Sequence, residues 1–556
     1  MQEGHALMWD TLVPADPAQS AEYYAAGWWR KETFTDDLAA AARDRPDHPA
    51  IIAYQDGQLA ATLTYGELAA LTDRFAAALI ELGVSHGDAV AIYLPNRWQV
   101  TALYLACNRI GAITTPVIPT LGGRELGHVL RSSGAKVCVT QDNYDGADYA
   151  ARLAEVAPET LAHQVVIGDA ARTAAISFGD FFCETPWEER NPLAGIAPGG
   201  PDEPSLLLYT SGTTGPMKGV VHSQNTLYAA VRSVSEPFGL TGDDVVTIPH
   251  FLTHLAAASC AAYLPVLVGG TSVLQDPNTD MDLLLDLIAA HRVSYLYAAP
   301  GYVVRLIAGQ RERPRDISSL RHFVSGSAPV QPQLIAGVRE QFGIPLHALW
   351  GMTENGSVTV TRPDDPEGWA ARSDGRPSPW MQVRVEPPAG DGAAGRLWVR
   401  GASQCLGYLG QAELYRSCLD DDGWFDTGDL AYDDGRGGIR ISGRRVDIIT
   451  RHNGQKVSAT ELENVLLDHP GVAEIAVFGY PDPDVPGADL VCATVVASGS
   501  PPTLEDLHDF LAQRQMGRVL WPDRLQYAWT LPRTALGKIQ RNLLRERIEI
   551  SLSRPS

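Results

Sequence analysis

In the first two thirds of the chain, short continuous apolar runs alternate with apolar residues at helical spacing. Residues 89–94 form such a run and predict a buried strand, whereas residues 98–110 predict a helix. A strand at 113–118, a helix from Glu125 and a strand at 136–140 continue the alternation. This order indicates parallel sheets covered by helices, in which ligands bind beyond the carboxyl ends of the strands.

One helix of this region also carries its start and stop signals. Thr64 and Glu67 form the Thr-x-x-Glu pattern of a capping box. Gly83 is typical of a helix end. Between them, apolar residues follow at helical spacing: Leu68, Leu71, Phe75, Leu79 and Leu82. We therefore predict a helix that begins after Thr64 and ends near Gly83.

Two stretches rich in glycine and proline, at 195–204 and 386–395, interrupt this pattern. The first leads into a buried strand at 205–209, and after the second, residues 397–400 and 439–442 predict short antiparallel strands.

From about Asp447 the alternation restarts, with helices near Thr460 and at 504–513 and strands at 472–480 and 490–496. We predict an α/β protein whose large N-terminal domain, residues 1–446, contains layered, mostly parallel sheets with helices. A small β-rich subdomain is expected at about 360–446. A small, mobile α+β C-terminal domain is expected at 447–556.

Charge and composition exclude several classes of function. The 556 residues include 44 Lys and Arg against 66 Asp and Glu, a formal net charge of −22, with no basic run. This balance argues against a protein that binds nucleic acid or an anionic membrane.

The start of the chain lacks the pattern of a signal peptide, and the longest apolar run, 255–268, is too short to span a bilayer. This run is expected to be a buried helix that leads into a buried strand. Seven scattered cysteines without a CxxC pattern indicate free thiols, so we expect a cytoplasmic protein.

The strongest local motif is the segment from Tyr209 to Gly219, directly after the strand at 205–209. Its glycines allow backbone N–H groups to face an anion, its hydroxyls add donors, and Lys218 adds charge. Only five of the 44 basic residues are lysines, which favours a specific use for Lys218 and Lys538. The segment does not have the pattern of a Walker loop. A polar surface turn without a ligand is the alternative interpretation, which the preceding strand and the lysine disfavour. We predict that it holds a polyphosphate.

With further ordered motifs, the chain resembles the adenylate-forming superfamily of acyl-CoA synthetases, peptide-synthetase adenylation domains and luciferases. The resemblance extends from about Thr64 to Arg541. After the phosphate segment, it rests on Ser325-Gly-Ser-Ala-Pro329, Trp350-Gly-Met-Thr-Glu354, Thr427-Gly-Asp429, Gly443-Arg444, Asp447 with Gly454, and Pro532-Arg-Thr-Ala-Leu-Gly-Lys538. The family usually has Tyr where this chain has Trp350.

The resemblance implies ATP, Mg²⁺ and coenzyme A as ligands and assigns roles to residues. Lys538, Thr353, Glu354 and Lys218 would be catalytic, Glu354 would hold the metal, and Asp447 would be the hinge of the C-terminal domain. The residues expected to bind nucleotide or coenzyme A are Thr210, Ser211, Gly212, Thr213, Thr214, Gly215, Ser325, Gly326, Ser327, Ala328, Pro329, Trp350, Gly351, Asp429, Arg444 and Gly454. A lysine that enters the site from a moving domain would stabilise charge on the carboxylate and the α-phosphate.

The expected pocket for the acid contains His250, Leu252, His254, Leu255, Ala258, Gly326 and Gly351. Residues 245–264 include no Asp or Glu, and a buried ammonium group without a carboxylate is costly, so an α-amino acid is disfavoured. A hydrophobic acid, cyclic or aromatic, fits better. His250 and His254 have a spacing that suits a metal on a helix, but packing or pocket lining is the preferred interpretation.

These observations predict an AMP-forming carboxylate–CoA ligase. The same motifs serve a stand-alone enzyme that loads the phosphopantetheine thiol of a carrier protein, and this alternative stays open, as does a homodimer. An oxygenase like luciferase and a nucleotide-binding protein without activity are less favoured, because a pure binder has no use for a mobile lysine.

Overall fold

The computed structural model describes residues 9, 12–13, 15–210, 217–277, 280–328, 330–386, 394–451, 456–482, 489–514, 516, 518–533 and 539–553. The chain forms two compact units: the first contains residues 1–382 and 400–423, and the second contains residues 383–399 and 424–556. This division into compact units does not test the domain boundary that we predicted between residues 446 and 447, so that boundary stays a prediction.

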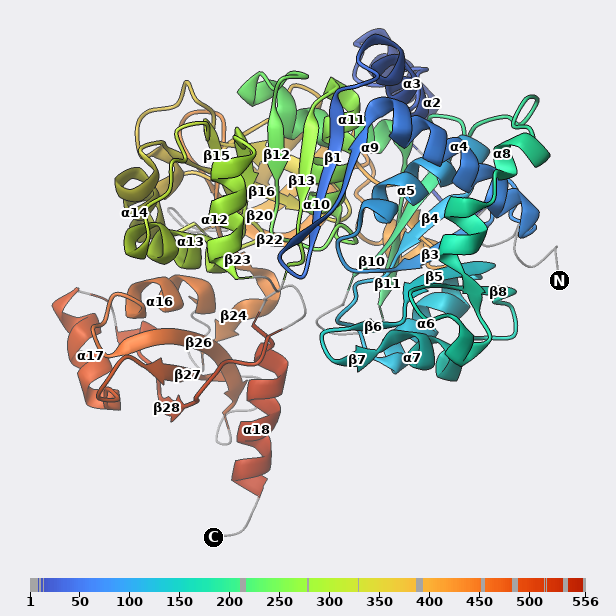
Figure 1. Cartoon of the computed structure of the whole chain (residues 1–556). Helices are drawn as coiled ribbons and strands as arrows, with labels where there is room; N and C mark the ends of the chain where they lie inside the picture. The colour runs from blue at the N-terminus through green and yellow to red at the C-terminus, as the bar shows by residue number, and fades with distance from the viewer. Residues whose placement is uncertain are drawn as a thin grey trace. The chain divides into compact units, whose positions relative to one another are not determined.

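Two large sheets form the first unit (Figure 1). The eight-stranded sheet has the order β21 (Gly407–Tyr408), β11 (Lys218–Ser223), β10 (Pro204–Thr210), β4 (Ile113–Pro116), β3 (Ala89–Tyr93), β5 (Val137–Gln141), β8 (His163–Ile167) and β9 (Ile176–Ser177). The nine-stranded sheet has the order β18 (Arg376–Pro377), β17 (Gly356–Val360), β16 (Leu346–Met352), β15 (His322–Gly326), β14 (Tyr295–Tyr297), β12 (Val245–Thr247), β13 (Thr271–Leu274), β1 (Pro49–Gln55) and β2 (Gln58–Thr64). The strands from β10 to β9 in the first sheet and from β16 to β1 in the second pair in parallel, which confirms the predicted fold class.

Helices cover these sheets. They are α2 (Pro17–Ala25), α3 (Phe34–Asp44), α4 (Tyr65–Glu81), α5 (Trp98–Ile110), α6 (Gly123–Ser133), α7 (Tyr149–Val156), α8 (Trp187–Arg190), α9 (Gln224–Ser235), α10 (Leu255–Ala257), α11 (Leu264–Val268), α12 (Met281–Ala290), α13 (Pro300–Glu312), α14 (Pro332–Phe342) and α15 (Ala412–Arg416). Helix α4 begins at the predicted capping box of Thr64 and Glu67. Helix α5 has the predicted bounds and is buried along nearly its whole length, because it belongs to the main core of the unit.

The apolar run 255–268 is helical throughout, and the strand that was expected to follow directly, β13, begins only at Thr271. A π-helical turn, Ala258–Tyr263, joins α10 to α11. Pro265 has no N–H to donate to the carbonyl of Ala261, and the Ser272 hydroxyl donates to that carbonyl instead, at 2.7 Å. Gly269, with φ +75°, then ends the helix in a left-handed conformation.

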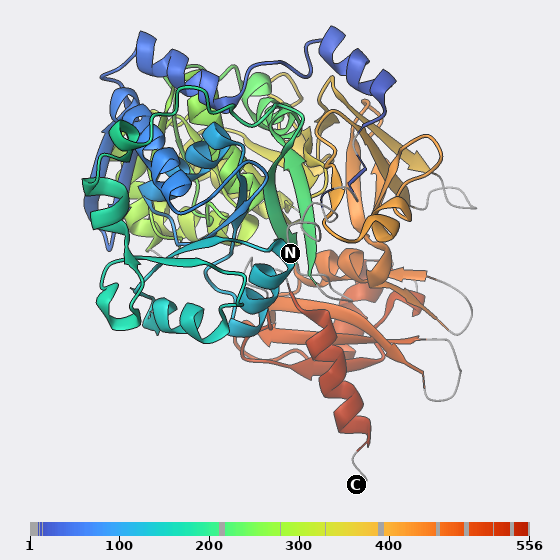
Figure 2. The ribbon, with the colours of Figure 1, turned by 90° about the vertical axis from the view of Figure 1, so that its right-hand side faces the viewer.

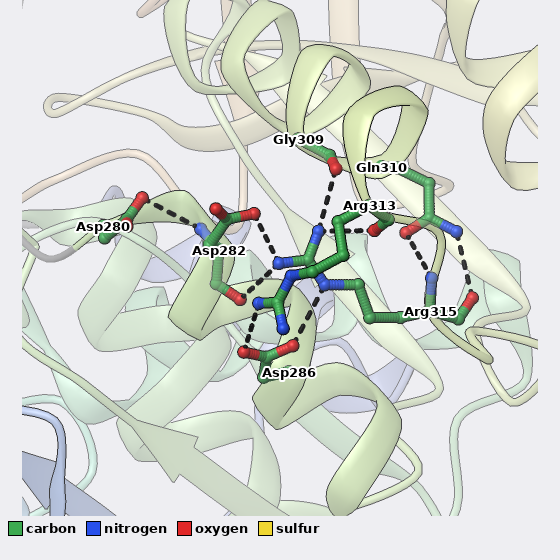
Figure 3. Close-up of polar contacts among 7 residues, drawn as sticks. All are labelled: Asp280, Asp282, Asp286, Gly309, Gln310, Arg313 and Arg315. Atoms are coloured by element: carbon green, nitrogen blue, oxygen red, sulfur yellow. Dashed lines mark hydrogen bonds and ion pairs between the residues drawn. The ribbon is translucent and has the colours of Figure 1, made fainter.

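Helices α12 and α13 are fastened by one buried arginine (Figure 3). The side chain of Arg315 is 6% exposed and lies between the carboxylates of Asp282 and Asp286, the latter at 3.0 Å. It also donates to the carbonyl oxygens of Gly309, at 2.8 Å, and Arg313, at 2.7 Å. The planar guanidinium group thus satisfies acceptors from both helices, which explains how the loop after α13 is held.

Among its described residues, the second unit contains two sheets of more than two strands. A four-stranded sheet consists of β19 (Met381–Glu386), β20 (Gly395–Gly401), β22 (Phe425–Asp433) and β23 (Ile439–Arg444), with antiparallel pairing between β20, β22 and β23. A three-stranded sheet consists of β26 (Val472–Pro481), β27 (Asp489–Ala497) and β28 (Arg524–Tyr527). The strands β24 (Ile448–Thr450) and β25 (Lys456–Ser458) form a separate pair.

The α-helices in the described part of this unit are α16 (Ala459–Leu466), α17 (Leu504–Gln513) and α18 (Arg541–Ser553). Leu462, Leu507 and Leu511 of α16 and α17 pack with β26 and β27 in one core cluster. The first half of α18 packs on the sheet through Leu544 and Ile548, and the helix then continues beyond the sheet (Figure 2). Among the described residues of either unit, no helix combines the length and the apolar character needed to cross a membrane.

Candidate active site

Two of the predicted nucleotide motifs lie at the carboxyl ends of neighbouring parallel strands. Gly326 of β15 pairs with Leu349 of β16, so the Ser325 and Trp350 motifs are adjacent. The glycines permit close backbone approach. A Cβ on Gly326 would lie 2.6 Å from the Leu349 carbonyl oxygen, and a Cβ on Gly351 would lie 2.2 Å from the Gly356 carbonyl oxygen. The structure thus brings together two motifs that are separate in the sequence, at the edge where such sheets bind ligands.

The residues after β15 have an unusual backbone. Ser327 has a backbone φ of +70°, which residues other than glycine seldom adopt. Its hydroxyl lies 2.9 Å from the Tyr297 hydroxyl. Ser327 and Ala328 are exposed, whereas the buried Ser325 hydroxyl has no hydrogen-bond partner among the residues described. Trp350 lies within β16, opposite Thr359, and its side chain is mostly buried. The strand therefore fixes the backbone of Trp350, whose ring we predicted to stack on a purine.

The ends of the predicted phosphate segment are placed by a strand pair. Thr210, the last residue of β10, lies opposite Lys218, the first residue of β11. Residues 211–216, which include Ser211, Gly212, Thr213, Thr214 and Gly215, lie outside the described residues, as do Pro329, Gly454 and Lys538. Their predicted roles stay predictions. The antiparallel pairing nevertheless shows that the intervening segment starts and ends at one point of the sheet edge.

The turn with Thr353 and Glu354, which follows β16, is held from two sides. The His222 ring of β11 donates from Nε2 to the Thr353 carbonyl oxygen at 2.7 Å. The Cys405 N–H donates to the Glu354 carbonyl oxygen, also at 2.7 Å. Burial lowers the pKa of His222 to about 4, so this ring is neutral near pH 7. The backbone of the turn is thereby fixed by neutral donors.

The Glu354 side chain receives a hydrogen bond that the sequence motifs did not predict. The Tyr408 hydroxyl donates to Oε1 of Glu354 at 2.8 Å, and the Nζ of Lys218 lies 5.0 Å from the centre of the same tyrosine ring. Tyr408 is 1% exposed and Glu354 is 8% exposed. Thus Lys218 and Glu354, two residues predicted to handle phosphate and metal, meet at one aromatic ring.

The residues of this turn fit the ligands that the resemblance implies. Among the described residues, the Tyr408 hydroxyl binds Glu354 at Oε1 and not at Oε2, and carboxylate oxygens are ligands that Mg²⁺ prefers. The Lys218 ammonium group supplies the positive charge that a triphosphate needs. Both polar atoms of the fully buried Asn355 side chain also lack a described partner. Glu354 would hold the metal, which supplies charge neutralisation when bound.

The predicted acid-binding segment is held by a buried asparagine that the motifs did not include. Asn96 donates to the carbonyl oxygens of His250, at 2.8 Å, and Gln275, at 2.9 Å, and accepts from the Leu252 N–H at 2.8 Å. The Nε2 of His250 accepts from the Ala299 N–H at 3.0 Å. Burial, with His254 as a second cause, lowers the pKa of His250 to about 3. His250 is therefore a neutral acceptor near pH 7.

The other pocket candidates occupy different environments. Leu252, Leu255 and Ala258 are buried in the main core cluster, where Tyr297 and Leu349 also lie. His254 precedes α10, and its Nδ1 accepts from the Ala256 N–H at 3.3 Å. Their assignment to a substrate pocket stays a prediction, but all three apolar residues are at most 5% exposed.

In the second unit, the predicted ribose residues are direct neighbours. Asp429 of β22 pairs with Arg444 of β23 in the sheet, and Arg444 Nε lies 3.1 Å from Asp429 Oδ1. Asp429 is buried, whereas the arginine side chain is 42% exposed. The Asp429 N–H also donates to the Thr427 hydroxyl at 3.0 Å, which explains the Thr-Gly-Asp motif as a structured turn.

The predicted hinge residue takes part in a cluster of ion pairs within the same unit. Asp447 Oδ2 lies 3.3 Å from Arg541, and Arg541 also binds Glu463 at 2.6 Å. Glu463 accepts from the Val477 N–H at 2.7 Å as well. Burial alone would lower the pKa of Arg541, but the charges of Glu463 and Asp447 raise it, so this arginine stays charged.

Three residues of the first unit were therefore missed: Asn96, His222 and Tyr408. His222 lies 131 positions from the turn that it holds, and Tyr408 lies 54 positions from Glu354. No local spacing connects residues so far apart. In the sequence, the signal nearest to Tyr408 was the preceding Gly407. The structure gives this glycine a φ of +135°, which favours glycine.

Comparisons with known proteins agree with this arrangement. A family model described as "AMP-binding enzyme" matches residues 38–409, and one described as "AMP-binding enzyme C-terminal domain" matches residues 461–538. A medium-chain fatty-acid–CoA ligase of Escherichia coli is 30% identical over 537 residues, which cover 95% of this chain and 92% of that protein. A salicyl-AMP ligase / salicyl-S-ArCP synthetase of Mycobacterium tuberculosis is 30% identical over 551 residues, 97% of this chain and 95% of that protein.

Among solved structures, ATP-bound MatB from Rhodopseudomonas palustris matches with a TM-score of 0.81 and 27% sequence identity. The match covers 93% of this chain and 99% of that one. All of these similarities except the C-terminal family model extend over most of the chain.

Proposed function

Because this chain belongs to the family of AMP-binding enzymes, which are adenylate-forming ligases, we propose that it joins a hydrophobic carboxylic acid to coenzyme A. In the first step, a carboxylate oxygen attacks the α-phosphorus of ATP, the bond between the α- and β-phosphate groups breaks, and pyrophosphate leaves. In the second step, the thiol sulfur attacks the acyl carbon, the bond to AMP breaks, and the thiol proton passes to solvent. The protein contributes position and charge rather than a covalent nucleophile.

The convergence of Lys218 and Glu354 on the Tyr408 ring is the observation that carries this proposal. A cation and a carboxylate side by side suit a ligand that contains both phosphate groups and Mg²⁺. In the proposed reaction Lys218 neutralises the phosphates, Glu354 holds the metal, Trp350 stacks on the adenine, and Asp429 with Arg444 binds the ribose. Lys538 stabilises the charge on the acid and the α-phosphate during the first step.

The acid that we propose is hydrophobic, and cyclic or aromatic acids are its favoured members. Residues 245–264 contain no acidic side chain that could pair with a substrate ammonium group. Two relatives at 30% identity support a hydrophobic acid by name, since one is a ligase of medium-chain fatty acids and the other a ligase of salicylate.

A panel of carboxylic acids tests this function. With Mg·ATP and coenzyme A, at least one fatty, cyclic or aromatic acid is expected to release AMP and form a thioester, detected by mass spectrometry. α-Amino acids serve as the negative arm. Absence of AMP release with every acid, or release with α-amino acids only, would contradict the proposal.

A carrier-protein thiol is the second candidate acceptor, supported by the similarity to the salicyl-S-ArCP synthetase. The discriminating experiment offers free coenzyme A and a phosphopantetheine-bearing carrier protein in parallel, with the same acid. Adenylate formation with both acceptors present, but transfer to the carrier protein alone, would favour the second candidate.

A further inference from the structure

Tyr408 lies between the two charged groups of the candidate active site. Its hydroxyl donates to Glu354 Oε1 at 2.8 Å, and its ring lies 5.0 Å from the Lys218 ammonium nitrogen. Its side chain is buried at 1% exposure. One side chain thus contacts both the predicted metal ligand and the predicted phosphate-binding cation.

Strand pairing puts Tyr408 in this place. β21 pairs with β11 in antiparallel register, with Tyr408 opposite Val220. Lys218 is two residues before Val220 on the same strand, so its side chain and that of Tyr408 are diagonal neighbours on one face of the sheet. The position is fixed further by backbone bonds of 2.8 Å from Leu406 N to Val221 O and from Leu409 N to Gly219 O.

The same segment also determines where Glu354 lies. The Cys405 N–H donates to the Glu354 carbonyl oxygen at 2.7 Å, so main chain and side chain of Glu354 are both held by residues 405–408. A carboxylate bound at one oxygen by a fixed donor loses most of its rotational freedom. Its other oxygen, Oε2, then has a defined direction before any ligand arrives.

We propose that Tyr408 is a positioning residue of the ATP site: its hydroxyl fixes Glu354 so that Oε2 faces Mg²⁺, and its ring limits the position of Lys218. This inference rests on the proposed function. A neutral donor suits this task, because an arginine in its place would neutralise the carboxylate and weaken its attraction for a cation. Burial and the charge of Glu354 raise the pKa of the Tyr408 hydroxyl, so it remains a donor over the range of working pH.

The neighbouring Tyr415 provides a matched control. Its ring contacts that of Tyr408 edge to face with centroids 5.3 Å apart, and it is also fully buried. Its hydroxyl, however, donates to the Cys405 carbonyl oxygen at 2.9 Å and not to Glu354. The Tyr415 hydroxyl also accepts from Nε2 of Gln404 at 3.3 Å. Removing either hydroxyl therefore deletes buried hydrogen bonding, but only the Tyr408 hydroxyl donates to the carboxylate of Glu354.

The test measures nucleotide binding without turnover. The wild type, Tyr408→Phe and Tyr415→Phe are titrated with an ATP analogue that has a methylene group between the α- and β-phosphates, by calorimetry at a series of Mg²⁺ concentrations. For Tyr408→Phe we expect the Mg²⁺ concentration at half-maximal binding to rise about tenfold, as for the loss of a hydrogen bond to a charged group. Tyr415→Phe should shift it less than about twofold.

A second variant separates orientation from packing. Tyr408→His retains a flat ring and an N–H donor, and it should recover part of the Mg²⁺ shift relative to Tyr408→Leu. In a Glu354→Gln background, Tyr408→Phe should have little further effect, because the two residues act through one carboxylate. Equal shifts in Tyr408→Phe and Tyr415→Phe, no recovery by His, or full additivity with Glu354→Gln would each overturn the inference.

The proposed function is tested separately in the same material. A wild type that forms an adenylate with some acid, together with a Tyr408→Phe variant of unchanged Mg²⁺ dependence, overturns this inference and leaves the function standing. A wild type that neither binds the analogue with Mg²⁺ nor releases AMP overturns both.

Discussion

The candidate residues of the two units are held by different kinds of interaction. In the first unit, the Thr353–Glu354 turn receives hydrogen bonds from a neutral histidine, a backbone N–H and a tyrosine hydroxyl. In the second unit, Asp429 and Asp447 each face an arginine, at 3.1 and 3.3 Å. The difference is one of charge: the first arrangement orients a carboxylate and leaves its charge free, whereas the second cancels the charge.

This contrast suggests what each unit is built to do. A carboxylate that must hold a metal has to be fixed before the ligand arrives, and neutral buried donors achieve this. An ion pair near water can exchange partners at little cost, which suits residues predicted to bind ribose or to act as a hinge. The buried part of the second cluster, Arg541 with Glu463, is an exception and should behave as a structural pair.

Glu463→Gln should have the largest effect on stability. It leaves the buried Arg541 charge with a neutral amide in place of its nearer partner and only the Asp447 carboxylate, at 3.3 Å, so the unfolding free energy of the second unit should fall by about 3 kcal/mol. Scanning calorimetry measures this as an earlier transition. Glu474→Gln is the control, because Glu474 and its partner Arg533 are both about half exposed, and it should cost less than about 1 kcal/mol. Equal losses in both variants would show that burial does not distinguish the two pairs.

Lys538→Ala should slow adenylate formation by about 10²–10³-fold, since it removes one charge that stabilises the transition state. Acid-dependent pyrophosphate exchange measures this step. Lys31→Ala changes the same charge at an exposed position of the first unit and should leave the exchange rate unchanged. An undiminished rate in Lys538→Ala would remove the catalytic role from this residue.

Acid should destabilise the first unit through its buried histidines. Burial lowers the pKa values of His222 and His347 to about 4 and that of His250 to about 3. In the unfolded protein these rings bind protons below about pH 6.5, whereas in the folded protein they stay neutral. The free energy of unfolding is therefore unaffected by them above that pH and falls as the pH drops towards 4. Each should cost about 2 kcal/mol by pH 5.

Urea unfolding at pH 7.5 and pH 5 measures this loss. His222→Gln should reduce the pH dependence, whereas His86→Gln, which alters a half-exposed ring, should not. A pH dependence that His222→Gln leaves intact would show that this ring is not the source.

Arg444→Gln should have the smallest effect. Its side chain is 42% exposed, so the loss of its ion pair with Asp429 should change the unfolding free energy by less than about 1 kcal/mol. ATP affinity should fall about fivefold if Asp429 and Arg444 bind the ribose together. Calorimetric titration with ATP measures this. An affinity equal to that of the wild type would separate Arg444 from the nucleotide site.

Local structure was largely readable from the sequence. Helix α5 has its predicted bounds, and α4 begins at the predicted capping box, because helical spacing and capping are properties of neighbouring residues. The apolar run 255–268 was less readable, since hydropathy shows neither the π turn at Ala258–Tyr263 nor the hydrogen bond from the Ser272 hydroxyl to the Ala261 carbonyl oxygen.

The amino-acid sequence by itself determined the order of strands and helices, the fold class and the set of nucleotide motifs, because each is written in residues close together along the chain. Only the tertiary structure decided that Tyr408 bonds Glu354 and flanks Lys218, and that His222 holds Thr353. Those contacts depend on which strands become neighbours, β21 beside β11 and the turn after β16 within reach of both. Side-chain periodicity reports the buried face of a strand but carries no information about its partner.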